Sequence, residues 1–223
     1  MTEEKNWDEY FEHYDPDDPY DFEWKGEYTN GEEEGLWEGF DKEGLLRERI
    51  YYKKGKRHGA WQSYWKNGQL GQEDTFQNGE CTGPCSRYWD DGMLHQRGAF
   101  KNGIKHGLWE YYYNNGNLSL LENYLDDELD GISESYSKLG YLWMQSNHKK
   151  GKLHGVMQIF HDNGKIYSIQ NFKNGKNIRT EFFDKHGFEL NEAGVRKGSI
   201  LEKIFKFVTW IDPTSPRSIW RKF

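Results

Sequence analysis

Aromatic residues recur along this chain at intervals of 24 residues, and this period constrains the fold more than any other feature. The column starts at Tyr28 and continues through Tyr52, Phe76, Phe100, Tyr124, His148 and Phe172. Glycines keep the same step in three further columns, which begin at Gly31, Gly35 and Gly44. Such a period is typical of repeat proteins, in which one small unit is stacked until neighbouring units share a core. The sequence therefore predicts an array of repeats.

The extent of the 24-residue period divides the 223 residues into three predicted regions. Residues 1–21 form an acidic cap segment with a short helix, residues 22–191 form about seven repeats, and residues 192–223 form a basic amphipathic helix and tail. A mean hydropathy of -1.08 is very polar, but an aromatic content of 17% contradicts disorder. We expect a thin sheet in which aromatic side chains do most of the burying.

Charge and cysteine content narrow the class of protein. A net charge of -7 argues against a general nucleic-acid binder and favours basic protein partners. The first residues lack the apolar stretch of a signal peptide, and no run is long enough to cross a bilayer. Cys81 and Cys85 are too few for a disulfide framework. We therefore expect a soluble protein in a reducing compartment, the cytoplasm.

Each repeat is predicted to be a β-hairpin. Asn115-Gly116 is the dipeptide most typical of a two-residue turn in which both residues have positive φ. That turn would pair Tyr113 with Leu118, and Trp109 with Glu122. Repeating the hairpin gives about a dozen short strands in an up-and-down meander. The predicted fold class is mostly β, an elongated antiparallel β-hairpin array of 24-residue repeats with short capping helices at both ends.

Period-two alternation sorts the aromatic residues of these strands into two faces. One face carries Trp61 and Trp109, with Cys85 in the same column, and is predicted to be buried. The opposite face is polar except for a second aromatic column, which comprises Phe40, Tyr64, Tyr88, Tyr112, Tyr136 and Phe160. This column is either a binding strip on a wet surface or, if a β-bulge turns the rings inward, a stack that packs the repeats together.

Helix signals stand at both ends of the array. Asn6 and Glu9 form a capping box ahead of apolar residues at helical spacing, and Ser199 and Glu202 repeat this signature. We expect these helices to cover the ends of the array or its open apolar face. Docking of the C-terminal helix on a membrane is the weaker alternative, because its basic residues are few.

Two further sets of residues invite a chemical interpretation. His58, His106 and His154 share one column, but two hairpins separate consecutive members, and about 19 Å is too far for ligands of one metal ion. Cys85 stands where other repeats have tryptophan, so we interpret it as a core residue. The sequence contains no recognisable catalytic triad, phosphate-binding loop or catalytic carboxylate pair. We therefore predict no enzyme, with no catalytic residues, no metal site and no cofactor.

The order Gly-x-Trp-x-x-Tyr, then Asn-Gly, then an aromatic residue followed by x-Asn-Gly, resembles the MORN repeat variant of bacterial YwqK-like antitoxins. The matching residues in one unit are Gly59, Trp61, Tyr64, Asn67, Gly68, Phe76, Asn78 and Gly79. The resemblance covers about residues 22–190, although the unit from Tyr124 has Asp127 for the turn glycine and Ser133 for tryptophan. It implies a β-hairpin array that acts as a scaffold or as an inhibitor of a partner protein.

The predicted function is a non-enzymatic protein-binding scaffold, an antitoxin-type inhibitor that neutralises a basic toxin or effector. Its binding residues would be Tyr64, Tyr88, Tyr112 and Tyr136, with Asp15, Asp17 and Asp18 providing electrostatic steering. The alternative is a MORN-type structural scaffold associated with membrane lipids or a larger assembly. That alternative needs a basic strip, which the array lacks, so neither a membrane nor a nucleic-acid partner is expected.

Overall fold

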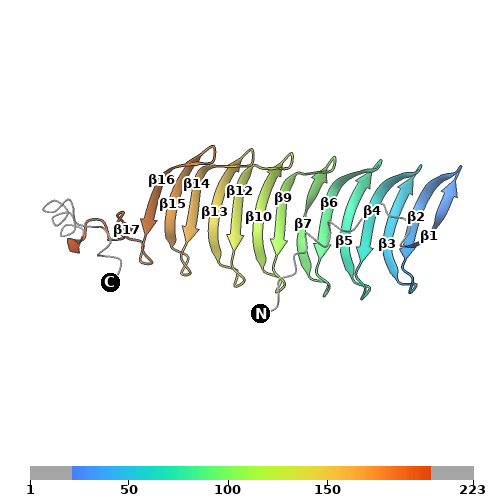
Figure 1. Cartoon of the computed structure of the whole chain (residues 1–223), viewed down its shortest axis with the longest axis horizontal. Coiled ribbons are helices and arrows are strands. Elements are labelled where there is room, and N and C mark those ends of the chain that lie inside the picture. The colour runs from blue at the N-terminus through green and yellow to red at the C-terminus, as the bar shows by residue number, and fades with distance from the viewer. Residues whose placement is uncertain (1–21, 202–223) are drawn as a thin grey trace. The chain divides into compact units, whose positions relative to one another are not determined.

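The computed structural model describes residues 22–201, most of which belong to antiparallel β-strands (Figure 1). The chain forms two compact units, one up to Ile104 and the other from Lys105 onward. The predicted N-terminal helix lies outside the described residues. Of the predicted C-terminal helix only the start is described, where Ile200 and Leu201 are helical.

Unit 1 is a meander in which each strand pairs antiparallel with the next. Its strands are β1 (Glu23–Thr29), β2 (Glu32–Phe40), β3 (Leu46–Lys53), β4 (Lys56–Tyr64), β5 (Leu70–Gln77), β6 (Glu80–Tyr88) and β7 (Leu94–Lys101), and β8 (Ile104–Lys105) follows at the boundary.

Unit 2 continues the same pattern of antiparallel hairpins. Its strands are β9 (Gly107–Tyr112), β10 (Leu118–Leu125), β11 (Glu128–Leu129), β12 (Gly131–Tyr136), β13 (Leu142–Lys149), β14 (Lys152–Phe160), β15 (Ile166–Lys173), β16 (Lys176–Phe183) and β17 (Glu189–Leu190). The predicted fold class, a mostly β array of antiparallel hairpins, is therefore confirmed.

The two ends of each hairpin close with different turns. At Asn78-Gly79 both residues have positive φ, 54° and 91°, between the paired Gln77 and Glu80, which is a two-residue type I′ turn. The same geometry recurs at six other turns, at Asn30-Gly31, Lys54-Gly55, Asn102-Gly103, Asp126-Asp127, Lys150-Gly151 and Asn174-Gly175. In each of these turns, the first turn residue lies two positions after a member of the aromatic column that starts at Tyr28, as Asn78 follows Phe76.

The turn at Asn115-Gly116 is different, and the predicted two-residue turn there is wrong. Only Gly116 has positive φ, and Tyr113 both accepts from the Gly116 amide (2.9 Å) and donates to the Asn117 carbonyl (2.9 Å). This is a three-residue loop in which a type I turn is followed by a left-handed glycine. Leu118 consequently pairs with Tyr112 and not with Tyr113.

The register farther from this loop was predicted correctly, since Trp109 pairs with Glu122. Asn115 serves the loop through its side chain: Oδ1 accepts from the Asn117 amide at 3.1 Å, and Nδ2 donates to the Lys138 carbonyl in the next hairpin at 2.8 Å. An Asn-Gly dipeptide thus fits both turns. In the two-residue turn both of its residues adopt positive φ, and in the three-residue loop the Asn side chain forms hydrogen bonds.

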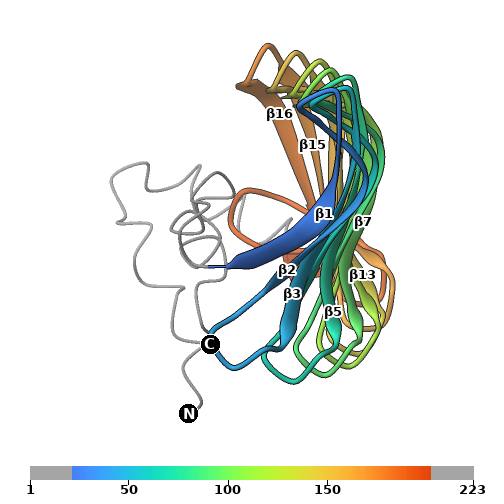
Figure 2. The same cartoon turned by 90° about the vertical axis from the view of Figure 1, so that its right-hand side faces the viewer.

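The glycine column that begins at Gly35 marks bulges inside the strands. Gly83 and Gly131 have φ of 99° and 115°, and each approaches a side chain of the preceding return strand: a Cβ on Gly83 would lie 3.4 Å from Thr75, and one on Gly131 3.3 Å from Asn123. A non-glycine residue there would meet both backbone strain and a neighbour. Bulges increase strand twist, and the strands of each unit bend along their length (Figure 2).

The face that carries the tryptophan column, called the Trp face below, is the packed face, as predicted. Trp37, Trp61 and Trp109 are 8%, 5% and 0% exposed, and Cys85 in the same column is buried. Each tryptophan meets the lattice aromatic residue of its own hairpin edge-on, at centroid distances of 6.0 Å (Trp37–Tyr52), 6.4 Å (Trp61–Phe76) and 6.3 Å (Trp109–Tyr124). Edge-to-face packing of these rings forms the core of these three hairpins.

A buried carboxyl also lies on the Trp face. Glu48 is 1% exposed, and its Oε2 accepts a hydrogen bond from Trp61 Nε1 at 3.0 Å. Burial raises the pKa of Glu48 to about 7, against the opposing effects of the Trp61 hydrogen bond and of nearby Arg57. In the preceding repeat, Trp24 stands where Glu48 would be, and Trp37 Nε1 has no hydrogen-bond partner within residues 22–201.

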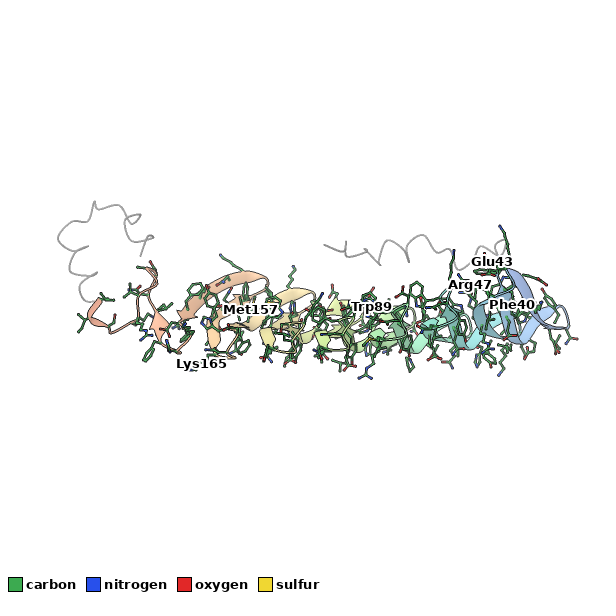
Figure 3. The ribbon with its side chains drawn as sticks, turned by 90° about the horizontal axis from the view of Figure 1, so that it is seen from below. Phe40, Glu43, Arg47, Trp89, Met157 and Lys165 are labelled. Atoms are coloured by element: carbon green, nitrogen blue, oxygen red, sulfur yellow. The ribbon has the colours of Figure 1, made fainter. Side chains whose placement is uncertain are left out.

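The three-residue loops are supported by a pair of side chains six residues apart, whose identity changes from repeat to repeat. Asp41 and Arg47 form an ion pair (3.4 Å), Trp89 and His95 stack with centroids 4.0 Å apart, and His161 and Tyr167 meet edge-on at 5.2 Å. Trp65 instead covers Gly71, where a Cβ would lie 3.0 Å from the indole. Figure 3, in which Arg47 and Trp89 are labelled, shows the side chains that line both faces.

The two turn types predict different effects on stability when their Asn is replaced by Gly. Asn78→Gly should leave the free energy of unfolding within about 0.5 kcal/mol of the parent value, because glycine adopts positive φ without strain. Asn115→Gly should cost about 1–2 kcal/mol, because it removes two side-chain hydrogen bonds from a residue without positive φ. Urea unfolding of both variants measures the difference, with Gln77→Gly as a control at an ordinary strand residue. Equal losses in the two Asn variants would contradict the turn assignment.

Glu48 predicts a specific dependence of stability on pH. Its folded pKa, about 7, exceeds the ordinary value of 4.5, so its contribution to stability is fully present below pH 4.5 and is lost as the pH rises through 7. Glu48→Gln should remove this loss, which is on the order of 3 kcal/mol, while its amide oxygen still accepts from Trp61. As the pH rises from 5 to 8, we expect the free energy of unfolding of the variant, measured in urea, to increase relative to that of the parent protein.

Glu43, an exposed carboxylate on the same unit (Figure 3), provides the matched control. Glu43→Gln should leave the difference between pH 5 and pH 8 unchanged. If Glu48→Gln and the parent protein lose stability in parallel over this range, the titrating group is not Glu48.

Candidate protein-binding face

The second aromatic column lies on the face opposite the tryptophans, called the Tyr face below. Tyr64 donates through its hydroxyl to Gln62 Oε1 at 2.9 Å, and Tyr136 donates to Glu134 Oε2 at 2.6 Å. Both acceptors stand two positions earlier on the same strand, hence on the same face. A register shift does occur beside Tyr64, but the extra residue is Gly71 on the partner strand, so the alternation of β4 is kept.

The rings of this column are half-buried, and side chains of the preceding return strand cover them. The Arg49 guanidinium lies 5.9 Å from the Tyr64 ring centroid, and Lys25 Nζ lies 4.7 Å from that of Phe40. Such contacts are cation–π interactions. Burial, and then the bond to Glu134, raises the pKa of Tyr136 to about 12. Tyr64, Tyr88, Tyr112 and Tyr136 therefore combine packing between repeats with partial exposure.

A further column of apolar side chains on the Tyr face lies four residues before the aromatic one, and most of its members are exposed. This apolar column consists of Leu36, Ala60, Pro84, Leu108, Ile132 and Val156. In unit 2, Leu108, Ile132 and Val156 are 47%, 44% and 39% exposed on β9, β12 and β14. Residues on every second strand of a sheet lie about 10 Å apart, so these three form a regular apolar row.

Asparagines hold the backbone beneath this row. Asn123 Nδ2 donates to the Ile132 carbonyl at 2.9 Å, and Asn147 Nδ2 donates to the Val156 carbonyl at 2.8 Å. These carbonyls follow the glycine bulges, where the ladder between strands is interrupted. The side-chain bonds replace the missing ladder bonds, and the apolar side chains are presented on a supported backbone.

The strip between the two columns is acidic in unit 2. It contains Glu110 and Glu134, and Glu134 also accepts from Gln145 Nε2 at 2.7 Å. Lys149 and Lys173 lie at strand ends beyond the apolar column. In unit 1 the corresponding strip is balanced, because Glu38 forms an ion pair with Arg49 at 2.8 Å. Unit 2 thus offers apolar side chains next to carboxylates, a combination that suits a partner with basic and apolar groups.

Two members of the histidine column contact turns. His154 Nδ1 lies 3.2 Å from Asn174 Oδ1, and His106 Nδ1 lies 3.7 Å from Asp126 Oδ1, so both contact residues of a following two-residue turn. Over residues 22–201 no group of three His, Cys, Asp or Glu side chains is arranged to hold a metal ion. Neither Cys81 nor Cys85 forms a disulfide.

A lysine enclosed by rings is the most unusual feature of the Trp face in unit 2. Lys105 Nζ lies 4.5 Å from the Trp109 centroid, 5.6 Å from that of Tyr111 and 4.9 Å from that of Tyr124, and it donates to the Tyr111 hydroxyl at 3.0 Å. The sequence prediction missed it, although an aromatic count on the two flanking strands was the available signal. The cage is filled by the chain's own ammonium group, so it stabilises the hairpin.

The structure describes the tyrosines of the predicted binding site but not its acidic residues. Tyr64 and Tyr88 in unit 1, and Tyr112 and Tyr136 in unit 2, occupy the same strand position on the Tyr face of their own unit, whereas Asp15, Asp17 and Asp18 lie outside the described residues. The apolar column was missed because its members differ in type, although they keep the 24-residue step. No helix among the described residues has the length and apolar character needed to span a membrane.

Comparison with known proteins identifies the repeat. Residues 57–78, 105–126 and 153–174 each match the model of the MORN repeat variant, and each match covers one hairpin with its three-residue loop. No curated protein matches the chain.

Two solved structures show a distant similarity. One is the crystal structure of a GtfA/B complex bound to UDP and GlcNAc, with 17% identity over 57% of this chain and 24% of that chain and a TM-score of 0.28. The other is the crystal structure of TarM, with 16% identity over 70% of this chain and 22% of that chain and a TM-score of 0.18. The chain spans less than a quarter of the length of either protein, and this likeness carries no argument about its function. The chain is therefore an array of antiparallel β-hairpins, three of which are similar to the MORN repeat variant.

Proposed function

We propose that this protein is a non-enzymatic scaffold that binds another protein through the Tyr face of its hairpins. The observation that carries the proposal is the apolar row Leu108, Ile132 and Val156, which stays exposed although the neighbouring columns are half-buried. Exposed apolar side chains in a regular row, bordered by polar groups, are characteristic of protein-binding surfaces. Tyr112 and Tyr136 on the same strands would supply the aromatic contacts that often dominate binding energy.

The partner we propose is a toxin or effector of basic charge, which the scaffold neutralises in the cytoplasm. Glu110 and Glu134, between the two columns, support the choice of a basic partner. The antitoxin role itself rests on the resemblance of the repeat to that of YwqK-like antitoxins. The acidic N-terminal residues Asp15, Asp17 and Asp18 would accelerate the encounter.

Removal of the apolar row should abolish binding without unfolding the protein. The variant carries Leu108→Ser, Ile132→Ser and Val156→Ser, which replace exposed side chains and leave the tryptophan core intact. The control carries Leu125→Ser and Leu139→Ser, which are 50% and 79% exposed at turns of the same unit. We expect a protein captured from host lysate by the parent and the control to be absent with the triple variant.

Titration calorimetry with that captured protein, once purified, should then show affinity reduced by at least about tenfold in the triple variant, as for loss of contacts at the centre of an interface. Equal affinity for the parent and the triple variant would refute the assignment of the Tyr face. A partner whose toxicity in cells is not relieved by co-expression of this protein would refute the antitoxin role and leave the binding role standing.

The aromatic column can be tested separately. Tyr112→Ala with Tyr136→Ala should abolish binding of the same partner, because both rings are removed from the proposed surface of unit 2. Since the rings are half-buried, we expect the melting temperature to fall by a few degrees only. Extensive unfolding of this variant at room temperature would show that the column belongs to the core and would exclude it from the binding site.

A further inference from the structure

The two terminal strands of the array leave hydrogen-bonding edges unpaired. Within residues 22–201, β1 pairs only with β2. β16 pairs with β15 along its length, but β17 covers its other edge only at Phe182 and Phe183. Among the described residues, no strand pairs with this edge along Lys176–Glu181, or with the outer edge of β1. Free edges of this kind can accept a further strand.

The two edges are of complementary type. Every hairpin consists of an outgoing strand and a return strand that face each other across a three-residue loop, as β2 and β3 do. β16 is an outgoing strand, and β1 is a return strand by its place in the 24-residue lattice. The free edge of each strand is the one that would face a strand of the other type. A second copy of the chain supplies that strand.

The internal register fixes which residues would meet. In β2–β3 the pairs are Leu36 with Tyr51, Trp37 with Ile50 and Glu38 with Arg49. By the lattice, Lys25 occupies the position of Arg49, and Glu27 that of Tyr51.

β16 is aligned in the same way. Glu181 pairs with Ile169 just as Gln158 pairs with Gln145 one repeat earlier, so Glu181 occupies the outgoing position of Gln158, which is also that of Glu38. Transfer of the register sets Glu181 opposite Lys25 of a second copy, and Arg179 opposite Glu27 of that copy.

Both of these cross-strand pairs join opposite charges, and one of them has an internal precedent. Glu38 and Arg49 occupy the corresponding positions in unit 1 and form an ion pair at 2.8 Å. Lys25 already covers the Phe40 ring as Arg49 covers Tyr64, so its ammonium group is placed for the same role. Within one chain these charges pair along their own strands, Arg179 with Glu181 at 2.5 Å and Lys25 with Glu23 at 3.5 Å.

We propose that the protein self-associates head to tail, with the free edge of β16 in one copy pairing with β1 of the next. β17 limits the matched stretch, so the contact is short and association needs a high protein concentration. Because the two surfaces differ, the contact does not close on a dimer and permits longer oligomers. This association uses strand edges and is independent of partner binding on the Tyr face.

Sedimentation velocity of the full chain over a range of concentrations tests the proposal. The parent protein should form a series of species beyond the dimer as concentration rises. Lys25→Glu should weaken association by about fivefold or more, because it places like charges opposite each other. Combining it with Glu181→Lys should restore association, and Lys149→Glu, which reverses an exposed lysine away from both edges, should leave it unchanged.

Three results would overturn the proposal. The first is a parent protein that stays monomeric at every concentration. The second is association that persists undiminished in Lys25→Glu. The third is a dimer that does not grow into longer oligomers and whose loss in Lys25→Glu is restored by adding Glu27→Lys but not by adding Glu181→Lys. This pattern would indicate symmetric pairing of two β1 strands.

Discussion

The hydrogen bonds that each tight turn makes to the hairpin before it hold the repeats in step. The amide of the second turn residue donates to a carbonyl 22 residues earlier: Gly79 to Arg57 at 2.8 Å, Gly103 to Cys81 at 2.8 Å and Asp127 to Lys105 at 3.0 Å. This amide is directed at the preceding hairpin only when the turn has left-handed geometry. The glycines that recur every 24 residues at the second turn position therefore favour the geometry that this bond requires.

The opposite ends of the hairpins are joined by side chains. Trp65 Nε1 and the Tyr113 hydroxyl donate to carbonyls of the following repeat, at 3.1 Å to Tyr88 and at 2.8 Å to Tyr136, and Asn115 and Asn163 reach forward in the same way. One end of each hairpin thus bonds backward through its backbone and the other bonds forward through side chains. Sequence varies more freely at the second end, because a side-chain donor can be indole, phenol or amide.

Much of the fold follows from the sequence, because a repeat multiplies every local signal. The period, the hairpins, the packed tryptophan column and Cys85 as its substitute were all predicted from spacing and alternation. The turn at Asn115-Gly116 was predicted wrongly because Asn-Gly suits two geometries, and its hydrogen bonds identify the one present. The exposure of Ile132 could not be predicted, because it depends on the bulge at Gly131 and on the bond from Asn123 that holds the strand there.

Bonds that reach only one hairpin backward or forward have a consequence for how such a chain evolves. The three segments that match the MORN repeat variant start 48 residues apart, at residues 57, 105 and 153, and each begins with a basic or apolar residue followed by His-Gly. The hairpins between them, which start at Cys81 and Leu129, lack this histidine. The alternation points to an ancestral unit of two hairpins, copied as a block. Because the turn and side-chain bonds described above reach only the neighbouring hairpin, gene duplication could lengthen the array without disturbing the hairpins already present.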